Sequence, residues 1–214
     1  MQFYGSTEAG GALTLLRPEE HDLNNEERLT SCGKPLPLID VRIVDTEGQD
    51  VPAGEAGELW VRTPGISKGY WRKPDSWLEV YEQGWFKTGD VARQDSEGFL
   101  YLVDRVKDMV VTGGENVYCS EVENCLSQHE AVRQVAVIGV PSERWGEEIK
   151  AMVILRDVFS VTDEELISYC KSRIAGYKCP KSVDFVDSYP VNANGKVLKR
   201  LLREPFWRSQ ERNV

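Results

Sequence analysis

Near its N-terminus the chain places hydroxyl groups beside a carboxylate, in the segment Tyr4-Gly5-Ser6-Thr7-Glu8. A threonine hydroxyl can donate to a phosphate oxygen, and a glutamate oxygen is the hard ligand that Mg²⁺ prefers. The segment could thus hold a phosphate and a cation together. Taken alone, a more ordinary interpretation is favoured, namely a loop that enters a helix with Ser6 or Thr7 as its N-cap.

Two further turns each present one charged side chain. In Lys87-Thr88-Gly89-Asp90, the carboxylate of Asp90 could accept two hydrogen bonds from a ribose diol, although an aspartate that closes a turn is a common alternative. In Asn194-Gly195-Lys196, a lysine on an exposed turn could reach into a cleft and neutralise developing negative charge. For any single lysine, a plain surface position is the commoner case.

The glycine-rich segment Met109–Asn116 contains the pair Gly113-Gly114 and is expected to lead into a helix. It lacks the G-x-x-x-x-G-K-[ST] pattern, and no lysine stands at the required place, so a phosphate-binding loop is rejected here. Adjacent glycines more often mark the close approach of the backbone to another group.

The elements that must position these residues differ between the two halves of the chain. The first half alternates short β-like runs with turns, which predicts a small antiparallel β-barrel or sheet. The runs are residues 38–44, 57–62, 91–93 and 99–103, and the last two flank a turn at 95–98 as a predicted β-hairpin.

After Arg105 the pattern becomes mixed. Two segments have the form of a capping box at a helix start, Ser120–Glu123 and Thr162–Glu165. Strands are expected at 134–140, ended by Pro141, and at 149–155 and 182–186, and a short basic helix should follow Asn194-Gly195. The predicted fold is therefore α+β, with a β-rich subdomain over residues 1–106 and a compact mixed α/β domain over residues 107–214.

Composition narrows the classes of function. Asp and Glu number 35 against 26 Lys and Arg, a net charge of −9, which argues against nucleic acid or an anionic membrane as the main partner. No apolar run approaches the roughly 18 residues that span a bilayer, and Met1–Gly5 has no signal-peptide character. Five cysteines without C-x-x-C spacing and two scattered histidines argue against a disulfide framework or a zinc site. We expect a cytoplasmic protein with reduced thiols.

The segments above are weak signals singly, but their order along the chain is specific. That order covers essentially the whole sequence and resembles the adenylate-forming superfamily, which contains acyl-CoA synthetases, luciferases and peptide-synthetase adenylation domains. In order, the motifs are Tyr4–Glu8, Gly57–Arg62, Gly69–Trp71, Trp85–Asp90, Gly98–Asp108, Gly113–Tyr118 and Asn194–Lys196.

The resemblance implies a reaction and a nucleotide site. Members of this family activate a carboxylic acid with ATP to an acyl-adenylate and then pass the acyl group to a thiol. By resemblance, Thr7 would contact the α-phosphate and Glu8 would bind Mg²⁺, in the motif that begins at Tyr4. Asp90 would hold the ribose hydroxyls with help from Arg105.

The same resemblance makes residues 107–214 a small C-terminal lid domain. Lys196 would lie over the carboxylate and the α-phosphate during adenylation, Lys107 would be the hinge between the two half-reactions, and Gly114 would line the path of the pantetheine thiol. A glycine suits such a path because it has no side chain. The implied ligands are ATP, AMP, Mg²⁺, coenzyme A and a carboxylic acid.

Within the superfamily, the hinge lysine Lys107 and the loop Gly113–Tyr118 are more similar to fatty acyl-CoA ligases than to peptide-synthetase domains. A luciferase is disfavoured, because its second lysine would fall at Val111. The expected function is therefore a part of an ATP-dependent carboxylic acid–CoA ligase in fatty acid metabolism.

One departure from the family pattern is the lack of its Ser/Thr/Gly-rich phosphate loop, which would precede Tyr4. Residues 1–106 are therefore expected to be the C-terminal remainder of the large adenylating domain. The chain is expected to be a fragment, a split-gene half that joins a separate N-terminal half, or a truncated reading frame. Two alternatives stay open: a non-catalytic remnant that binds a nucleotide or a partner, and an adenylation domain that loads a carrier protein.

Overall fold

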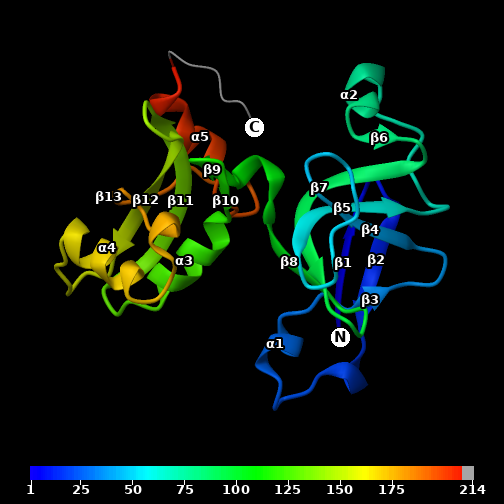
Figure 1. The fold of residues 1–214 in the computed structure, drawn as a ribbon, viewed down its shortest axis with the longest axis horizontal. Coiled ribbons are helices and arrows are strands. Elements are labelled where there is room, and N and C mark those ends of the chain that lie inside the picture. The colour runs from blue at the N-terminus through cyan, green and yellow to red at the C-terminus, as the bar shows by residue number, and fades with distance from the viewer. Residues whose placement is uncertain (209–214) are drawn as a thin grey trace. The chain divides into compact units, whose positions relative to one another are not determined.

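The computed structural model describes residues 1–208, which divide into two compact units, one over Met1–Val106 and a second that begins at Lys107 (Figure 1). Antiparallel strands dominate the first unit, and helices accompany a mixed sheet in the second. The predicted α+β class is therefore confirmed. In the described part of the chain, no helix is long and apolar enough to cross a membrane.

Two sheets form the first unit. A three-stranded sheet has the order β1-β2-β3, and a five-stranded sheet has the order β4-β5-β7-β6, with β8 paired to β7. The strands are β1 (Gln2–Ser6), β2 (Gly11–Leu16), β3 (Lys34–Pro35), β4 (Asp40–Val44), β5 (Ala56–Arg62), β6 (Tyr81–Glu82), β7 (Trp85–Gln94) and β8 (Leu100–Arg105). The short helices are η1 (Pro18–Glu20), α1 (Glu26–Leu29) and α2 (Pro74–Leu78).

The core of this unit follows from strand periodicity. Along β5, the buried positions Gly57, Leu59 and Val61 alternate with more exposed ones, because successive side chains of a strand point to opposite faces. Leu59 and Val61 pack in one apolar cluster with Trp77, Phe86 and Leu100 among others.

The hairpin predicted around residues 95–98 is confirmed as β7 and β8. The turn is held by the carboxylate of Asp95, which accepts hydrogen bonds from the backbone N–H groups of Glu97 and Phe99, both at 2.9 Å. Gly98 takes a φ of +87°, which costs a glycine little.

The second unit is built on a five-stranded sheet of order β10-β9-β12-β11, with β13 paired in parallel to β12. Its strands are β9 (Val110–Thr112), β10 (Glu115–Val117), β11 (Val132–Ser142), β12 (Gly146–Leu155) and β13 (Ser182–Phe185). Its helices are η2 (Val106–Asp108), α3 (Cys119–Ser127), α4 (Asp163–Lys171), η3 (Gly176–Lys178), α5 (Lys199–Arg203) and η4 (Glu204–Phe206).

Both faces of this sheet are covered. On β11, Val137 faces α3 and α4, whereas its neighbours Ala136 and Ile138 face the C-terminal segment that includes Leu202 and Phe206. The strand is buried on both sides, which explains why it reads as a valine-rich run rather than as an alternating one.

Three local predictions in this half were wrong. Helix α3 begins at Cys119 with Tyr118 as its N-cap and no side-chain cap, so Ser120 lies inside the first turn and forms no capping box. Strand β11 continues through Pro141 to Ser142, because Pro141 lies where an edge strand needs no N–H donor. The Gly113-Gly114 pair turns a β-hairpin between β9 and β10 rather than leading into a helix.

The capping box predicted at Thr162 is confirmed. The Thr162 hydroxyl accepts from the N–H of Glu165 at 3.2 Å, and the Glu165 carboxylate accepts from the N–H of Thr162 at 2.8 Å.

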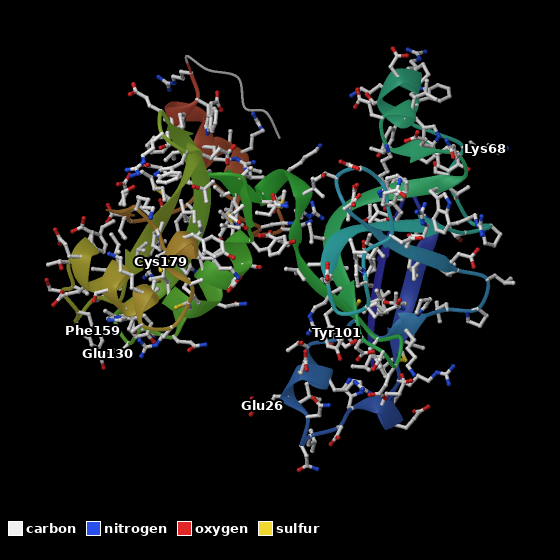
Figure 2. All side chains as sticks on the ribbon, in the orientation of Figure 1. Glu26, Lys68, Tyr101, Glu130, Phe159 and Cys179 are labelled. Carbon is white, nitrogen blue, oxygen red and sulfur yellow. The ribbon has the colours of Figure 1, made fainter. Side chains whose placement is uncertain are left out.

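All five cysteines are free and buried, and Figure 2 shows Cys179 inside the second unit while Glu130 and Phe159 lie at its surface.

Candidate active site

A carboxylate on β7 lies at the centre of the polar cluster in the first unit. The Tyr4 hydroxyl donates to Asp90 Oδ2 at 2.6 Å, and Arg105 Nε lies 3.1 Å from Asp90 Oδ1. The backbone N–H of Asp90 donates to the Thr88 hydroxyl at 3.1 Å. The turn predicted at Lys87–Asp90 is wrong, because strand β7 runs through these residues. One phenol and one guanidinium therefore orient both oxygens of this carboxylate.

The register of the β7–β8 hairpin brings Arg105 to this position. Ala92 pairs with Leu102, but a bulge between Val91 and Ala92 shifts the register so that Asp90 pairs with Arg105. Without that extra residue, Asp90 would lie opposite Asp104, and two like charges facing each other across strands are destabilising.

Burial and charge fix the protonation of Tyr4. Desolvation raises the pKa of Tyr4 well above its ordinary value, and the hydrogen bond to Asp90 and the charge of that carboxylate raise it further. The phenol therefore remains a donor at neutral pH. The Asp90 side chain is 15% exposed and the Arg105 side chain 58% exposed, so a ligand can reach both. A carboxylate has about four acceptor positions, so Asp90 can still accept from two hydroxyl groups.

The Thr7-Glu8 segment is the turn of the β1–β2 hairpin. The N–H of Gly10 donates to Thr7 O at 3.2 Å, and the N–H of Ser67 donates to Glu8 O at 2.7 Å. The Tyr70 hydroxyl donates to Glu8 Oε1 at 3.1 Å. The pKa of Tyr70 is raised, chiefly by desolvation and further by this hydrogen bond. Thr7 is exposed and Glu8 is half-buried, so the turn offers a hydroxyl and a carboxylate to an incoming ligand.

The ordinary interpretation of this segment, a loop entering a helix, is wrong. Strand β1 ends at Ser6 and strand β2 begins at Gly11, with only a turn between them. A Cβ on Gly5 would lie 1.9 Å from the carbonyl oxygen of Gly11, so only glycine fits where the two strands approach. The Ser6 hydroxyl does accept from the N–H of Ala9 at 3.2 Å, which is the local bond that a cap would also form.

In the second unit, Lys196 lies on a tight hairpin between β13 and α5. Its side chain is exposed, and within residues 1–208 its ammonium group has no hydrogen bond or ion pair. Gly114 is the second residue of the Gly-Gly turn, with a φ of +86°, and a Cβ built there would meet nothing within 4 Å. Both residues therefore face open space within their own unit.

Lys107 opens the second unit. Its carbonyl oxygen accepts from Arg203 Nη1 at 2.8 Å, and the same nitrogen lies 3.1 Å from Asp108 Oδ1. The peptide group after Lys107 is therefore held to helix α5. Rotation at the junction would have to use the torsions of Lys107 itself and of the residues before it.

The structure thus brings Tyr4, Asp90 and Arg105 into direct contact, and it continues β1 from Tyr4 into the Thr7-Glu8 turn. Lys107, Gly114 and Lys196 belong to the second unit and are not among those contacts. Sequence reasoning gave no role to Tyr70, the partner of Glu8. No local signal marks that pair, because the two residues are 62 positions apart.

Family models match two parts of the chain. The model for AMP-binding enzymes matches residues 1–71, and the model for the AMP-binding enzyme C-terminal domain matches residues 121–196. Among curated proteins, the medium/long-chain-fatty-acid–CoA ligase FadD8 of Mycobacterium tuberculosis is 43% identical, over 100% of this chain and 38% of its own length. A feruloyl-CoA synthase of Amycolatopsis is 45% identical, over 96% of this chain and 41% of its own length.

Solved structures give the same picture. The amide bond synthetase McbA from Marinactinospora thermotolerans matches with a TM-score of 0.84 and 38% identity, over 96% of this chain and 42% of that one. The o-succinylbenzoate CoA synthetase MenE of Bacillus subtilis, in complex with ATP and magnesium, matches with a TM-score of 0.81 and 37% identity, over 94% and 40% of the two chains. The chain therefore spans about two fifths of the length of the proteins it matches.

Proposed function

Because this chain belongs to the adenylate-forming superfamily and matches the C-terminal part of its acid–CoA ligases, we propose that it supplies the ribose-binding residues and the lid of an ATP-dependent acid–CoA ligase. In the proposed reaction, a carboxylate attacks the α-phosphate of ATP and releases pyrophosphate, which leaves an acyl-adenylate. The thiol of coenzyme A then attacks the acyl carbon and releases AMP. The names of the two curated relatives support a fatty or similar organic acid as the substrate.

One observation carries this proposal, namely the Asp90 carboxylate held between the Tyr4 hydroxyl and Arg105. A fixed carboxylate with unused acceptor positions suits the two adjacent hydroxyl groups of a ribose. Arg105 Nε lies 3.1 Å from one oxygen of this carboxylate, and its side chain is 58% exposed, so the guanidinium can also reach the ligand. Asp90 is thus assigned to the ribose, with Arg105 and Tyr4 orienting it.

The turn at Thr7 and Glu8 is assigned to the phosphates. The Thr7 hydroxyl would donate to the α-phosphate. Glu8 would hold Mg²⁺ through its carboxylate, which also accepts a hydrogen bond from the Tyr70 hydroxyl. This hard oxygen donor fits the preference of Mg²⁺, which supplies charge neutralisation at the phosphates when bound. Solved MenE in complex with ATP and magnesium supports this assignment by likeness.

Three residues of the second unit are assigned to the lid. The exposed ammonium of Lys196 would approach the α-phosphate, where negative charge grows as the new bond forms. Lys107 would provide the soft torsion between adenylation and thioester formation. Gly114, with open space where a side chain would project, would border the path of the pantetheine thiol. Free thiols and an acidic net charge suit the cytoplasm as the site of the reaction.

The test uses a chimeric ligase, defined as the M. tuberculosis medium/long-chain-fatty-acid–CoA ligase with its matching C-terminal part replaced by this chain. We expect the chimeric ligase to release pyrophosphate with medium- and long-chain fatty acids and to form acyl-CoA. Coenzyme A, a carrier-protein thiol and a simple amine are compared as acceptors. A chimeric ligase that folds like its parent and forms no acyl-adenylate would count against the proposal.

The carrying observation is tested by Asp90→Asn, which keeps the shape of the side chain and removes its charge. Hydrogen bonds to charged groups contribute about 1.5–3 kcal/mol, so the KM for ATP should rise by roughly 10- to 100-fold. Asp40→Asn is the matched control, because Asp40 pairs with Arg62 on the same sheet but is exposed. An equal KM for ATP in the two variants would remove Asp90 from the nucleotide site.

A further inference from the structure

The hairpin that carries Lys196, defined here as Pro190–Leu198, closes on itself. The N–H of Leu198 donates to Pro190 O at 2.8 Å, and Val191 bridges to Val197. The N–H of Asn192 donates to Lys196 O at 2.9 Å, and the N–H of Gly195 donates to Asn192 O at 2.9 Å. These bonds define the base of the hairpin and one side of its tip.

The side chain of Asn192 accepts two backbone N–H groups at the tip of the hairpin. Its Oδ1 accepts the N–H of Asn194 at 3.0 Å and the N–H of Lys196 at 2.9 Å. One carbonyl oxygen with two lone pairs can accept both bonds at once. The backbone N–H of Lys196 is therefore fixed by a side chain and not by another strand.

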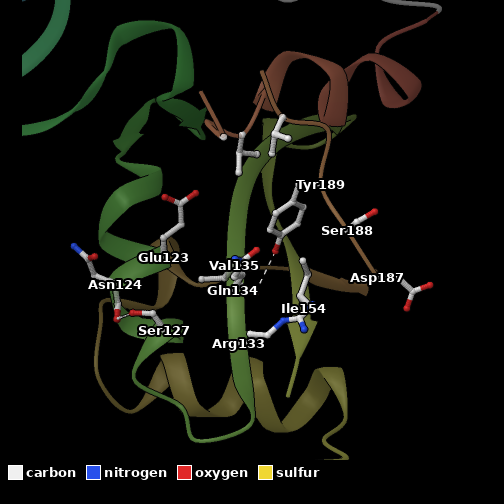
Figure 3. Close-up of a pocket in the computed structure, with 13 residues that line it drawn as sticks. Glu123, Asn124, Ser127, Arg133, Gln134, Val135, Ile154, Asp187, Ser188 and Tyr189 are labelled. Carbon is white, nitrogen blue, oxygen red and sulfur yellow. Dashed lines mark hydrogen bonds between the residues drawn. The ribbon is translucent and has the colours of Figure 1, made fainter. Parts of the chain in front are cut away.

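The rest of the unit gives the tip little support. Gly195 and Val197 border an open hollow of about 520 Å³ between α3, β11 and the segment after β13. Figure 3 shows Glu123, Asn124 and Ser127 on one side of this hollow and Asp187, Ser188 and Tyr189 on the other. Packing cannot hold the tip from this direction.

The unit holds the hairpin at its two ends. Just before Pro190, the Tyr189 hydroxyl donates to Met152 O at 2.7 Å. Lys199 Nζ lies 2.7 Å from Glu123 Oε1, and the same oxygen accepts the N–H of Val137 at 2.7 Å. The two side chains of this ion pair are only 15% and 23% exposed. The start of α5 is thus tied to α3 and β11, whereas residues 192–196 are all exposed.

We propose that Asn192 is a positioning residue for Lys196, and the proposal rests on the adenylation role assigned to Lys196 above. Asn192 holds the hairpin tip so that the Lys196 side chain leaves the unit in one direction. A lysine that is already oriented loses less conformational entropy when it meets the α-phosphate. Asn192 acts on the first half-reaction only, because thioester formation does not use Lys196.

The first test needs only this chain. Asn192→Ala removes the acceptor, Asn192→Asp keeps an oxygen that can accept both N–H groups, and Asn194→Ala removes an equivalent exposed amide that does not accept these bonds. Hydrogen exchange is measured on the amides of residues 194–196. Loss of two hydrogen bonds should speed their exchange by roughly tenfold in Asn192→Ala, with little change in the other two variants. Unchanged exchange in Asn192→Ala would overturn the proposal.

The second test measures the half-reactions in the chimeric ligase. Asn192→Ala should slow acyl-adenylate formation by about tenfold, and thioester formation from supplied acyl-adenylate should stay within about twofold. Asn192→Asp should restore adenylation to near the unsubstituted rate. A purely structural role would lower both half-reactions together, and that result would refute the assignment.

The Lys196→Ala background separates this inference from the proposed function. If Lys196→Ala lowers adenylation and Asn192→Ala adds nothing in that background, Asn192 acts through Lys196. If Lys196→Ala lowers adenylation but Asn192→Ala alone does not, the positioning role is wrong and the proposed function stands. If Lys196→Ala leaves adenylation unchanged, the role assigned to Lys196 in the proposed function is wrong, and the positioning role for Asn192 fails with it.

Discussion

Replacing Tyr4 with phenylalanine removes a single oxygen from the site and keeps the ring. The lost hydrogen bond to Asp90 is short, at 2.6 Å, and its acceptor is charged. Such bonds contribute about 1.5–3 kcal/mol, but the Asp90 side chain is 15% exposed and keeps Arg105, so water recovers part of this. We expect Tyr4→Phe to lower the free energy of unfolding of the first unit by about 1–2 kcal/mol.

The size of this loss should depend on pH in a definite direction. The folded chain raises the pKa of Tyr4 above its ordinary value of about 10, chiefly by desolvation. The contribution of Tyr4 is therefore fully present below about pH 10. Above that pH, the unfolded chain gives up the phenolic proton that the folded chain keeps, so the advantage of the unsubstituted chain over Tyr4→Phe shrinks toward the raised folded-state pKa.

The assay is urea unfolding of this chain and its variants at pH 8 and above pH 10. Tyr81→Phe is the matched control, because Tyr81 stacks on Trp77 in the same unit and its hydroxyl takes part in no hydrogen bond within residues 1–208. If Tyr4→Phe and Tyr81→Phe are equally stable at pH 8, the Tyr4–Asp90 hydrogen bond does not stabilise the folded unit. A gap that widens above pH 10 would contradict the assigned direction of the pKa shift.

Three further predictions concern the half-reactions of the chimeric ligase. Lys196→Ala should lower acyl-adenylate formation by about 10²-fold or more, the usual effect of losing a charge-stabilising donor, and should largely spare thioester formation; equal losses would exclude this role. Gly114→Leu should block thioester formation. Gly114→Ala is the control, because it shares the strain of the +86° φ and lacks the bulk of leucine. Equal rates of thioester formation in the two variants would show that Gly114 is only a turn residue. Lys107→Pro should leave adenylation and abolish acyl-CoA formation, with Lys107→Ala mild by comparison, because proline fixes φ near −65° and restricts the preceding residue. Unchanged rates in the proline variant would place the hinge elsewhere, and a loss of thermal stability would identify misfolding.

The sequence predicted the family and the fold class, because ordered motifs and strand periodicity are properties of the sequence itself. The antiparallel hairpin at 95–98 and the capping box at Thr162 followed from turn and cap residues. The Gly113-Gly114 hairpin was missed although Gly-Gly between two β-like runs is a hairpin signal. Val110 and Val111, just before the two glycines, belong to strand β9, which pairs with β10 after them.

The geometry of the site could not be predicted from local patterns. The Tyr4–Asp90 hydrogen bond joins residues 86 positions apart, and the pairing of Asp90 with Arg105 depends on a one-residue bulge that no turn residue announces. The roles of Thr7, Glu8, Gly114 and Lys196 stay predictions. The bond from Asn192 to Asn194 could be predicted from sequence, because the side chain of an asparagine in a turn often accepts the backbone N–H two residues later.

Helix α5 has a consequence for motion at the junction. Its last residue, Arg203, holds the carbonyl of Lys107, and its first residue, Lys199, is tied to Glu123 only three positions after Lys196. The junction and the Lys196 hairpin are thus fastened to the two ends of one five-residue helix. Rotation about Lys107 would therefore move Lys196 together with α5 as one rigid segment. A substitution that destabilised α5 would loosen both the junction at Lys107 and the hairpin that carries Lys196.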